Sequence, residues 1–235
     1  MSIGTLNAGP LHEALKAEYL HAYGQSRDSA HEVAVGDFVA DVRGTDGALY
    51  EIQTSGFSAI RRKLRTLIAD HRVILVHPIA ARYRIVKLAA TDKGTTRRRS
   101  PKRGHPAQVA SELVYIPDLL AHPNFELEVV MVELDEMRRH DPKRTRRRGG
   151  WRVEARVLTR IVSRHRFRSL DDLFGLARSP LPSPFTTADL SEALAQPRRV
   201  AQKLAYVLRV GGVVDVCGKK GNALCYRRKN PTSAD

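Results

Sequence analysis

The chain has 235 residues, of which 42% are hydrophobic, so it can form a packed core and is not a disordered chain. It contains no apolar run near the roughly 20 residues of a membrane span, and its N-terminus lacks the pattern of a secretory signal. Forty Lys and Arg residues against 25 Asp and Glu give a formal net charge of +15. Such a charge attracts polyanions, nucleic acid first and anionic membrane second. We therefore expect a cytoplasmic, nucleoid-associated protein.

Apolar spacing in the first third of the chain predicts alternating helices and strands. Leu11, Leu15 and Tyr19 recur every four residues, as on one face of a helix. The continuous apolar run at 72–79 is typical of a buried central strand. The predicted elements are, in chain order, a helix over 11–23, strands over 32–43 and 49–55 joined by a turn at Thr45-Asp46-Gly47, a helix over 57–69, and strands over 72–79 and 83–88.

The middle of the chain has mixed patterns. Residues 151–167 fit helical spacing, yet their β-branched content equally permits a strand. His71 and His77 flank the buried strand without a paired acid or Cys in a recognisable motif, so we interpret both as structural. The other predicted elements are a basic loop over 92–106, a helix over 107–120, a strand over 125–132 and a short helix over 169–176 capped by Ser169.

The end of the chain has the pattern of a small α+β winged-helix domain, residues 185–229. Three prolines within 179–184 predict a linker before it. Cys217 and Cys225 are interpreted as strand positions, because two cysteines give no disulfide framework. The predicted elements are helices over 188–194 and 198–209, then strands over 213–217 and 223–226 with a hairpin tip at 218–222.

Two acidic side chains of the first predicted hairpin are candidates for a metal site. A three-residue turn pairs Arg43 with Leu49 and Asp41 with Glu51, and Gln53 shares the face of Glu51. Two close carboxylates repel unless a cation lies between them, and oxygen ligands favour Mg²⁺ or Mn²⁺. Such an ion polarises a phosphoryl oxygen and activates water, so the pattern predicts phosphodiester hydrolysis.

The order helix, strand with Asp41, strand with Glu51-Ile52-Gln53, helix and buried strand resembles the PD-(D/E)XK nuclease superfamily, in particular its resolvase-like and competence-nuclease-like branches. The resemblance covers roughly residues 9–90. It implies a restriction-endonuclease-like α/β fold, a mixed sheet flanked by helices, and metal-dependent cleavage of DNA. Asp41 matches the family's Asp, Glu51 matches its Glu, and Gln53 stands where the family has Lys.

The substitution at Gln53 leaves the source of positive charge open. A Gln side chain cannot supply the charge that helps to activate the water. Lys63 on the next predicted helix, or Lys16 on the first one, could take that part.

The acidic positions have rivals as well. Resolvase-like members carry a Glu after a Gly on the first helix, and Glu13 has that spacing from Gly9, with Glu18 as its rival. Asp37 lies four residues before Asp41 in the same predicted strand. We prefer Asp41, because the hairpin register sets it opposite Glu51.

Basic residues are candidates for nucleic-acid contacts, and arginine in particular suits bidentate contacts to phosphate. Two clusters lie among Gly, Pro, Ser and Thr, and more basic residues occupy the second helix and hairpin tip of the winged-helix pattern. The predicted contact residues are Arg97, Arg98, Arg99, Lys102, Arg103, Arg146, Arg147, Arg148, Arg198, Arg199, Gln202, Lys203, Lys219 and Lys220.

Together these patterns predict a nuclease-like domain over 1–178, a proline-rich linker and the winged-helix domain. The expected function is a metal-dependent endonuclease acting on duplex, branched or damaged DNA, with catalytic residues Asp41, Glu51, Gln53, Glu13 and Lys63 and a Mg²⁺ or Mn²⁺ cofactor. The alternative is a catalytically inactive DNA-binding regulator or repair accessory protein, which Gln53 favours. An RNA- or ribosome-associated factor and a homodimer both stay open.

Overall fold

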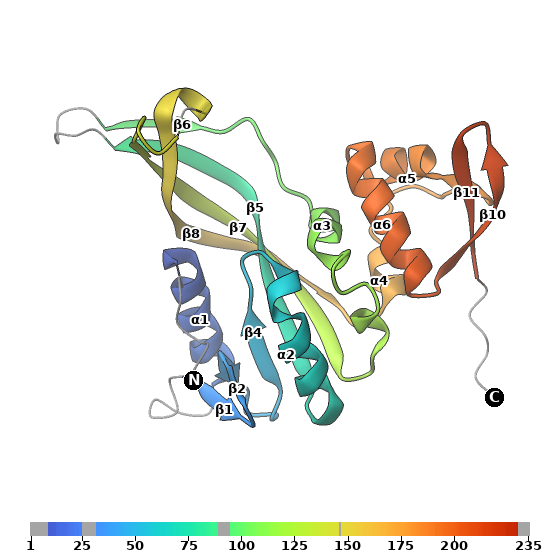
Figure 1. The fold of residues 1–235 in the computed structure, drawn as a ribbon, viewed down its shortest axis with the longest axis horizontal. Coiled ribbons are helices and arrows are strands. Elements are labelled where there is room, and N and C mark those ends of the chain that lie inside the picture. The colour runs from blue at the N-terminus through green and yellow to red at the C-terminus, as the bar shows by residue number, and fades with distance from the viewer. Residues whose placement is uncertain (1–8, 25–31, 89–94, 146, 230–235) are drawn as a thin grey trace. The chain divides into compact units, whose positions relative to one another are not determined.

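The computed structural model describes residues 9–24, 32–88, 95–145 and 147–229 (Figure 1). The fold is mixed α/β with a central mixed sheet flanked by helices, as predicted. The chain divides into two compact units, the first comprising the residues up to Thr54, 74–104 and 128–165, and the second comprising 55–73, 105–127 and the residues from Arg166 onward. The predicted boundary lay at 179–184, whereas the compact units interleave along the chain.

A six-stranded sheet forms most of the first unit, in the order β3-β4-β5-β7-β8, with β6 paired to β5. The pairs β3–β4 and β5–β6 are antiparallel. The elements are α1 (Pro10–Tyr23), the separate ribbon β1 (Val33–Val35) and β2 (Phe38–Ala40), β3 (Val42–Arg43), β4 (Leu49–Ile52), β5 (Val73–Leu88), β6 (Thr96–Arg99), β7 (Phe125–His140), the 3-10 turn η5 (Arg147–Gly150) and β8 (Trp151–Phe167).

Helix α1 covers the core of the first unit. Its residues Leu11, Leu15 and Tyr19 are buried, as their spacing predicted. Burying one such side chain contributes about 1.5–3 kcal/mol. The strand residues in the same cluster are Val42, Tyr50, Ile52, Ile74, Val76, Val130, Val132 and Leu134. This packing fixes which face of each strand points toward α1.

The predicted strand over 32–43 is wrong, because the chain folds back inside it. Gly36 has φ +56°, a conformation that favours glycine, and the turn at Gly36 and Asp37 pairs Val35 with Phe38. The two predicted strands at 72–79 and 83–88 are instead one strand, β5. Residues 97–99 of the predicted basic loop form strand β6, because the long β5 offers them a pairing edge.

Residues 151–167 form a strand, which settles the assignment that the sequence left open. Acidic residues of β7 meet arginines of β8, and such cross-strand ion pairs stabilise a sheet. This partnership also explains why β7 runs on to His140, beyond the predicted end at 132. Three pairs have this polarity: Glu128–Arg164 at 3.9 Å, Glu133–Arg160 at 3.1 Å and Glu136–Arg156 at 3.6 Å. In a fourth pair, Arg139–Glu154 at 2.8 Å, the arginine is on β7 and the acid on β8.

The second unit contains most of the helices, and none in the described part of the chain is long and apolar enough to cross a membrane. Its three-stranded antiparallel sheet has the order β10-β11-β9. The elements are α2 (Phe57–Asp70), η3 (Pro106–Val109), α3 (Ala110–Leu113), η4 (Leu119–Ala121), α4 (Leu170–Phe174), β9 (Phe185–Thr186), α5 (Thr187–Leu194), α6 (Arg198–Val210), β10 (Val214–Lys220) and β11 (Ala223–Arg228).

The predictions for the end of the chain agree closely with this unit. Ser169 caps α4 and Thr186 caps α5, each through a capping box with the Asp three residues later. Residues 179–184 have no regular structure, as expected of a linker. The predicted helix over 107–120 is wrong. Its residues form only the short η3 and α3 and the first part of η4, and Pro117 interrupts any longer helix.

A buried polar network joins α1 to β7 and β8. The Tyr19 hydroxyl donates a hydrogen bond to Glu128, a residue that is 3% exposed. Burial and the neighbouring carboxylate raise the pKa of Tyr19 far above its usual range, so the phenol keeps its proton. Arg164 balances the charge of Glu128 and lies over the Tyr19 ring, 5.2 Å from its centroid.

We expect Tyr19→Phe to lower the free energy of unfolding by about 1–3 kcal/mol, because it leaves a buried carboxylate without its hydroxyl donor. Denaturant unfolding measures this change. Tyr115→Phe is the control, because the Tyr115 side chain is 50% exposed and its variant should unfold like the wild type. Equal stability of all three proteins would contradict the role given to this hydrogen bond.

Candidate functional site

The β3–β4 hairpin has the register that the sequence predicted. Arg43 pairs with Leu49 and Val42 with Tyr50, across a turn closed by Gly44 and Ala48. The ladder ends at the pair of Val42 and Tyr50, and Asp41 lies in the bend just before β3. The Oδ2 atom of Asp41 accepts a hydrogen bond of 2.8 Å from the backbone nitrogen of Ile52, which ties the acid to the neighbouring strand.

Strand alternation sets the direction of Glu51, whereas contacts with α1 set that of Asp41. Val42, Tyr50 and Ile52 all belong to the core cluster with α1, so Glu51, which lies between Tyr50 and Ile52, takes the other side of β4. The side chain of Asp41 is 15% exposed, and Glu51 is 5% exposed. Carboxylates so deeply placed need compensating partners, which is why such positions are often functional.

Helix α1 brings two cationic side chains to Asp41, which lies in the bend before β3. The Lys16 Nζ atom is 3.9 Å from Asp41 Oδ1 and 3.6 Å from Glu32 Oε1, and its side chain is 10% exposed. The His12 Nε2 atom is 3.5 Å from Asp41 Oδ2. His12 was missed by the sequence analysis, although it stands four residues before Lys16 and therefore on the same helix face.

The carboxylate of Asp41 holds the pKa of His12 above its ordinary value. The largest cause is a hydrogen bond to Asp41, which outweighs the opposing effect of burial, and Glu13 adds a smaller contribution in the same direction. The Nδ1 atom of His12 lies 3.2 Å from Glu13 Oε1. Protonated His12 thus links Glu13 to Asp41.

The backbone of Gln53 joins β4 to β5. Its N–H donates to Val76 at 2.8 Å, and its carbonyl accepts a hydrogen bond of 2.8 Å from Nδ1 of His77. His77 is 7% exposed, and this bond agrees with its interpretation as a structural histidine. Gln53 therefore stands just beyond Glu51, at a fixed backbone position.

The other candidate residues that the sequence offered for this site lie at different places on the fold. Glu18 is exposed on α1, and Asp37 is exposed at the tip of the β1–β2 ribbon, away from the β3–β4 ladder. Glu13 is mostly exposed and reaches the cluster through His12. Lys63 is half-buried on α2, in the second compact unit.

The donor set suits a hard divalent cation with an incomplete protein shell. Two carboxylates and an amide match Mg²⁺ or Mn²⁺, which usually keep several waters and take one or two protein carboxylates. Within the described ranges, no three or more His, Cys, Asp or Glu side chains are grouped to hold a metal ion. An ion at this site would therefore rest on Asp41 and Glu51, with Gln53 and water completing its shell.

The predicted basic residues of the first unit lie around β6. Arg97, Arg98 and Arg99 are exposed on that strand, and Lys102 and Arg103 are exposed in the segment after it. Arg146 and the side chains of Arg147 and Arg148 lie outside the described residues.

The exposed face of α6 carries polar and basic side chains in a helical stripe. Arg199, Gln202, Tyr206 and Arg209 are all exposed, whereas Lys203 is half-buried. Arg198 is exposed at the start of the same helix, where its Nε atom lies 3.5 Å from Thr187 Oγ1.

The hairpin after α6 is longer than predicted. Strand β10 runs to Lys220, so the tip is the two-residue turn at 221–222. Lys219 and Lys220 are exposed beside that turn, at the end of the strand.

The first unit thus presents the Asp41 carboxylate beside a buried lysine, and the second presents a helix pair followed by a basic hairpin. The chain belongs to the family described as "Domain of unknown function (DUF8091)", whose model matches residues 9–168. It is also 31% identical over 232 residues to an "Uncharacterized protein" of Treponema pallidum (strain Nichols), a match that covers 98% of this chain and 89% of that protein. No solved structure matches the chain.

The contact between His12 and Asp41 gives a testable pH dependence. We expect Asp41→Asn to lower the pKa of His12 toward its ordinary value of 6.5, and Glu13→Gln to lower it less. Because the folded pKa is raised, the stability from this contact is fully present below the unfolded pKa and is lost as pH rises through the folded one. NMR titration of the His12 ring measures both shifts. Identical titration curves in the wild type and Asp41→Asn would disprove the contact.

Proposed function

We propose that this chain is a divalent-metal-dependent endonuclease whose reactive centre comprises Asp41, Glu51 and Lys16. The observation that carries the proposal is the placement of two little-exposed carboxylates at neighbouring positions of one hairpin. Glu51 lies in β4, Asp41 accepts a hydrogen bond from the next residue of that strand, Ile52, and the Lys16 ammonium is 3.9 Å from Asp41. That lysine provides the positive charge that Gln53 lacks. The resemblance to PD-(D/E)XK nucleases supplies the reaction class, cleavage of a phosphodiester bond.

Each residue has a distinct part in this scheme. Asp41 and Glu51 would hold Mg²⁺ or Mn²⁺, which polarises a phosphoryl oxygen and lowers the pKa of bound water. The ammonium of Lys16, desolvated on α1, would stabilise negative charge as it develops on the scissile phosphate. His12 and the Ile52 backbone amide orient the Asp41 carboxylate from two directions. Gln53 offers an amide oxygen beside Glu51.

We expect Asp41→Asn and Glu51→Gln each to reduce cleavage of plasmid or branched DNA with Mg²⁺ or Mn²⁺ by at least about a hundredfold, the usual effect of losing one preorganised electrostatic group. Binding of the same DNA in EDTA should persist. Glu18→Gln is the control, because Glu18 is an exposed acid of α1 and should leave cleavage unchanged. Undiminished cleavage by both site variants would exclude this centre.

The same assay identifies the lysine. Lys16→Met should lose activity to a degree similar to that of the carboxylate variants. Lys63→Met should lose activity only if Lys63, rather than Lys16, supplies the positive charge. Activity retained in both variants would remove the lysine from the scheme and leave the carboxylates to be judged separately.

A second candidate is a DNA-binding regulator or repair accessory protein on the same fold without turnover. Gln53 favours it, because the family's Lys is absent from that position. The exposed stripe of α6 and the lysines at the hairpin suit a winged helix, with the helix in the major groove and the hairpin on phosphate. This candidate expects DNA binding with steep salt dependence and no cleavage with any divalent metal.

The winged-helix interpretation makes its own prediction. We expect Arg199→Gln and Lys219→Gln each to weaken duplex binding and to reduce the slope of log affinity against log salt by about one, the loss of one phosphate contact. Fluorescence anisotropy at several salt concentrations measures both effects. Glu192→Gln is the control on α5 and should not weaken binding. Unchanged salt slopes in both basic variants would contradict this interface.

A further inference from the structure

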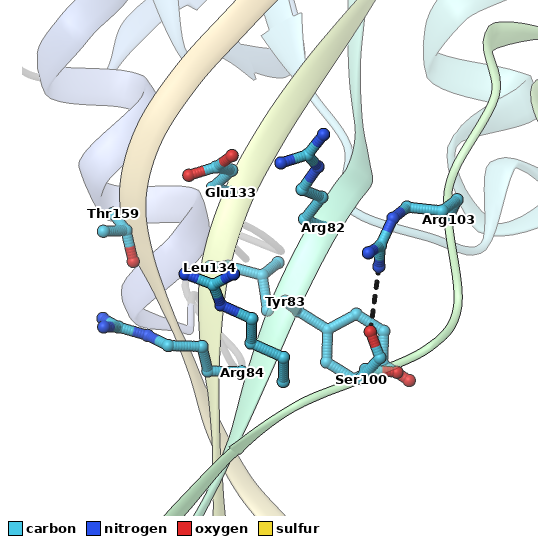
Figure 2. A pocket seen from close by; sticks show the side chains of 9 residues that line it. Arg82, Tyr83, Arg84, Ser100, Arg103, Glu133, Leu134 and Thr159 are labelled. Carbon is cyan, nitrogen blue, oxygen red and sulfur yellow. Dashed lines mark hydrogen bonds between the residues drawn. The ribbon is translucent and has the colours of Figure 1, made fainter.

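The first unit contains a pocket of about 190 Å³ that the carboxylate site does not use. Four arginines line it: Arg82 and Arg84 from β5, Arg99 from β6, and Arg103 from the segment that follows. Figure 2 shows Arg82 and Arg84 projecting from the same strand, with Arg103 opposite them and Thr159 on β8. Glu133 is the acidic residue among the pocket's lining.

The positions of two of these arginines are electrostatically unfavourable. Arg84 pairs directly with Arg99 across β5 and β6, and like charges in directly opposed positions destabilise a sheet. Asp135 offsets only one of them, through two bonds of 2.7 and 2.9 Å to Arg84. An arrangement that costs stability in the empty protein is expected where an anion supplies the missing charge.

The acids near the pocket already have partners. Asp135 binds Arg84, and Glu133 binds Arg160 at 3.1 Å. Across residues 9–24, 32–88, 95–145 and 147–229, no acidic side chain forms an ion pair with Arg82, Arg99 or Arg103. These three guanidinium groups therefore present uncompensated positive charge around one small cavity.

The wall of the pocket is anchored at both ends. The N–H of Ser100 donates to Tyr83 at 2.9 Å, and the N–H of Gly104 donates to Ala81 at 3.2 Å. A Cβ atom at Gly104 would lie 2.3 Å from the Ala80 carbonyl oxygen, so only glycine permits this approach to β5. The segment that carries Arg103 is thus fixed against the strand that carries Arg82.

Arg103 is itself preorganised. Its Nη1 atom donates to the carbonyl oxygens of Ser100 at 2.9 Å and Lys102 at 3.1 Å, and the first of these bonds is drawn in Figure 2. Holding a long side chain in place before binding reduces the entropy lost when a ligand arrives. Remaining donors of this planar group stay available for an anion.

We propose that this pocket binds a phosphate group of a polynucleotide, held by Arg82, Arg99 and Arg103 with the Thr159 hydroxyl beside them. Arginine clusters recognise phosphate through paired N–H donors, and the volume admits a phosphate with part of its sugar. The choice of polynucleotide rests on the proposed function. The phosphate chemistry is common to a backbone phosphodiester, a terminal monophosphate and free phosphate.

The test is the double variant Arg82→Gln/Arg99→Gln, with binding measured by fluorescence anisotropy in EDTA so that cleavage plays no part. Oligonucleotides of one sequence carry either a 5′-phosphate or a 5′-hydroxyl. We expect at least tenfold weaker binding and a salt slope reduced by about one. Arg82→Lys/Arg99→Lys should lose less, because it keeps the charge but not the paired donors.

The matched control is Arg65→Gln/Arg139→Gln, which removes the same charge from arginines that already bind Asp118 and Glu154. It should change affinity less than threefold. Loss confined to the 5′-phosphate oligonucleotide assigns the pocket to a terminal phosphate, and equal loss for both assigns it to the backbone. The proposal is overturned if only the binding of inorganic phosphate depends on these arginines. It is also overturned if the double variant binds both oligonucleotides with the affinity of the wild type.

The outcome is separable from that for the nuclease. If no divalent metal supports cleavage but the arginine variants still bind oligonucleotides more weakly, the protein has a phosphate pocket without catalysis. Conversely, suppose that cleavage depends on Asp41 and Glu51 while Arg82→Gln/Arg99→Gln binds DNA as tightly as the wild type. That result would overturn the pocket proposal alone. Thermal unfolding of each variant excludes loss of the fold as the cause.

Discussion

The pairing of Val42 with Tyr50 is the constraint on which the proposed reactive centre depends. A shift of one residue would turn every side chain of the hairpin to the other face. With the observed register, Val42, Tyr50 and Ile52 pack under α1 and Glu51 takes the opposite side of β4. Asp41, in the bend before β3, lies beside His12 and Lys16 of α1. The ring of Tyr50 stacks on Tyr23 at 4.9 Å, so the aromatic packing of α1 and the strand pairing enforce the same register.

Charged side chains are balanced in one part of the first unit's sheet and unbalanced in another. Where acids of β7 meet arginines of β8, opposite charges stabilise long strands whose side chains would otherwise favour solvent. Around the β5–β6 pair the balance fails, because Arg84 and Arg99 oppose each other and only one has an acidic partner. Basic residues are therefore not evenly neutralised by acids in this unit, and this local imbalance is the basis of the proposed phosphate pocket.

The sequence predicted the elements whose signals are local. The turn at 45–47, the cap at Ser169 and helix α6 all follow from neighbouring residues. The strand character of 151–167 could not be decided, because it depends on ion pairs with a strand far away in the chain. At the site, the pairing of Arg43 with Leu49 followed from the turn, whereas the contacts of His12 and Lys16 with Asp41 depend on the packing of α1. The composition of the second unit also depends on tertiary contacts that the sequence does not reveal. It brings together residues 55–73, 105–127 and the end of the chain.

The central claim is that Asp41 and Glu51 share one divalent cation. A crystal structure of the protein soaked in Mn²⁺, with data collected to record the anomalous signal of manganese, tests it most directly. We expect one anomalous peak within about 2.0–2.3 Å of an oxygen from each carboxylate, close to the side chain of Gln53. Saturating Mn²⁺ that leaves the space between the two carboxylates empty, with the hairpin register intact, would contradict it.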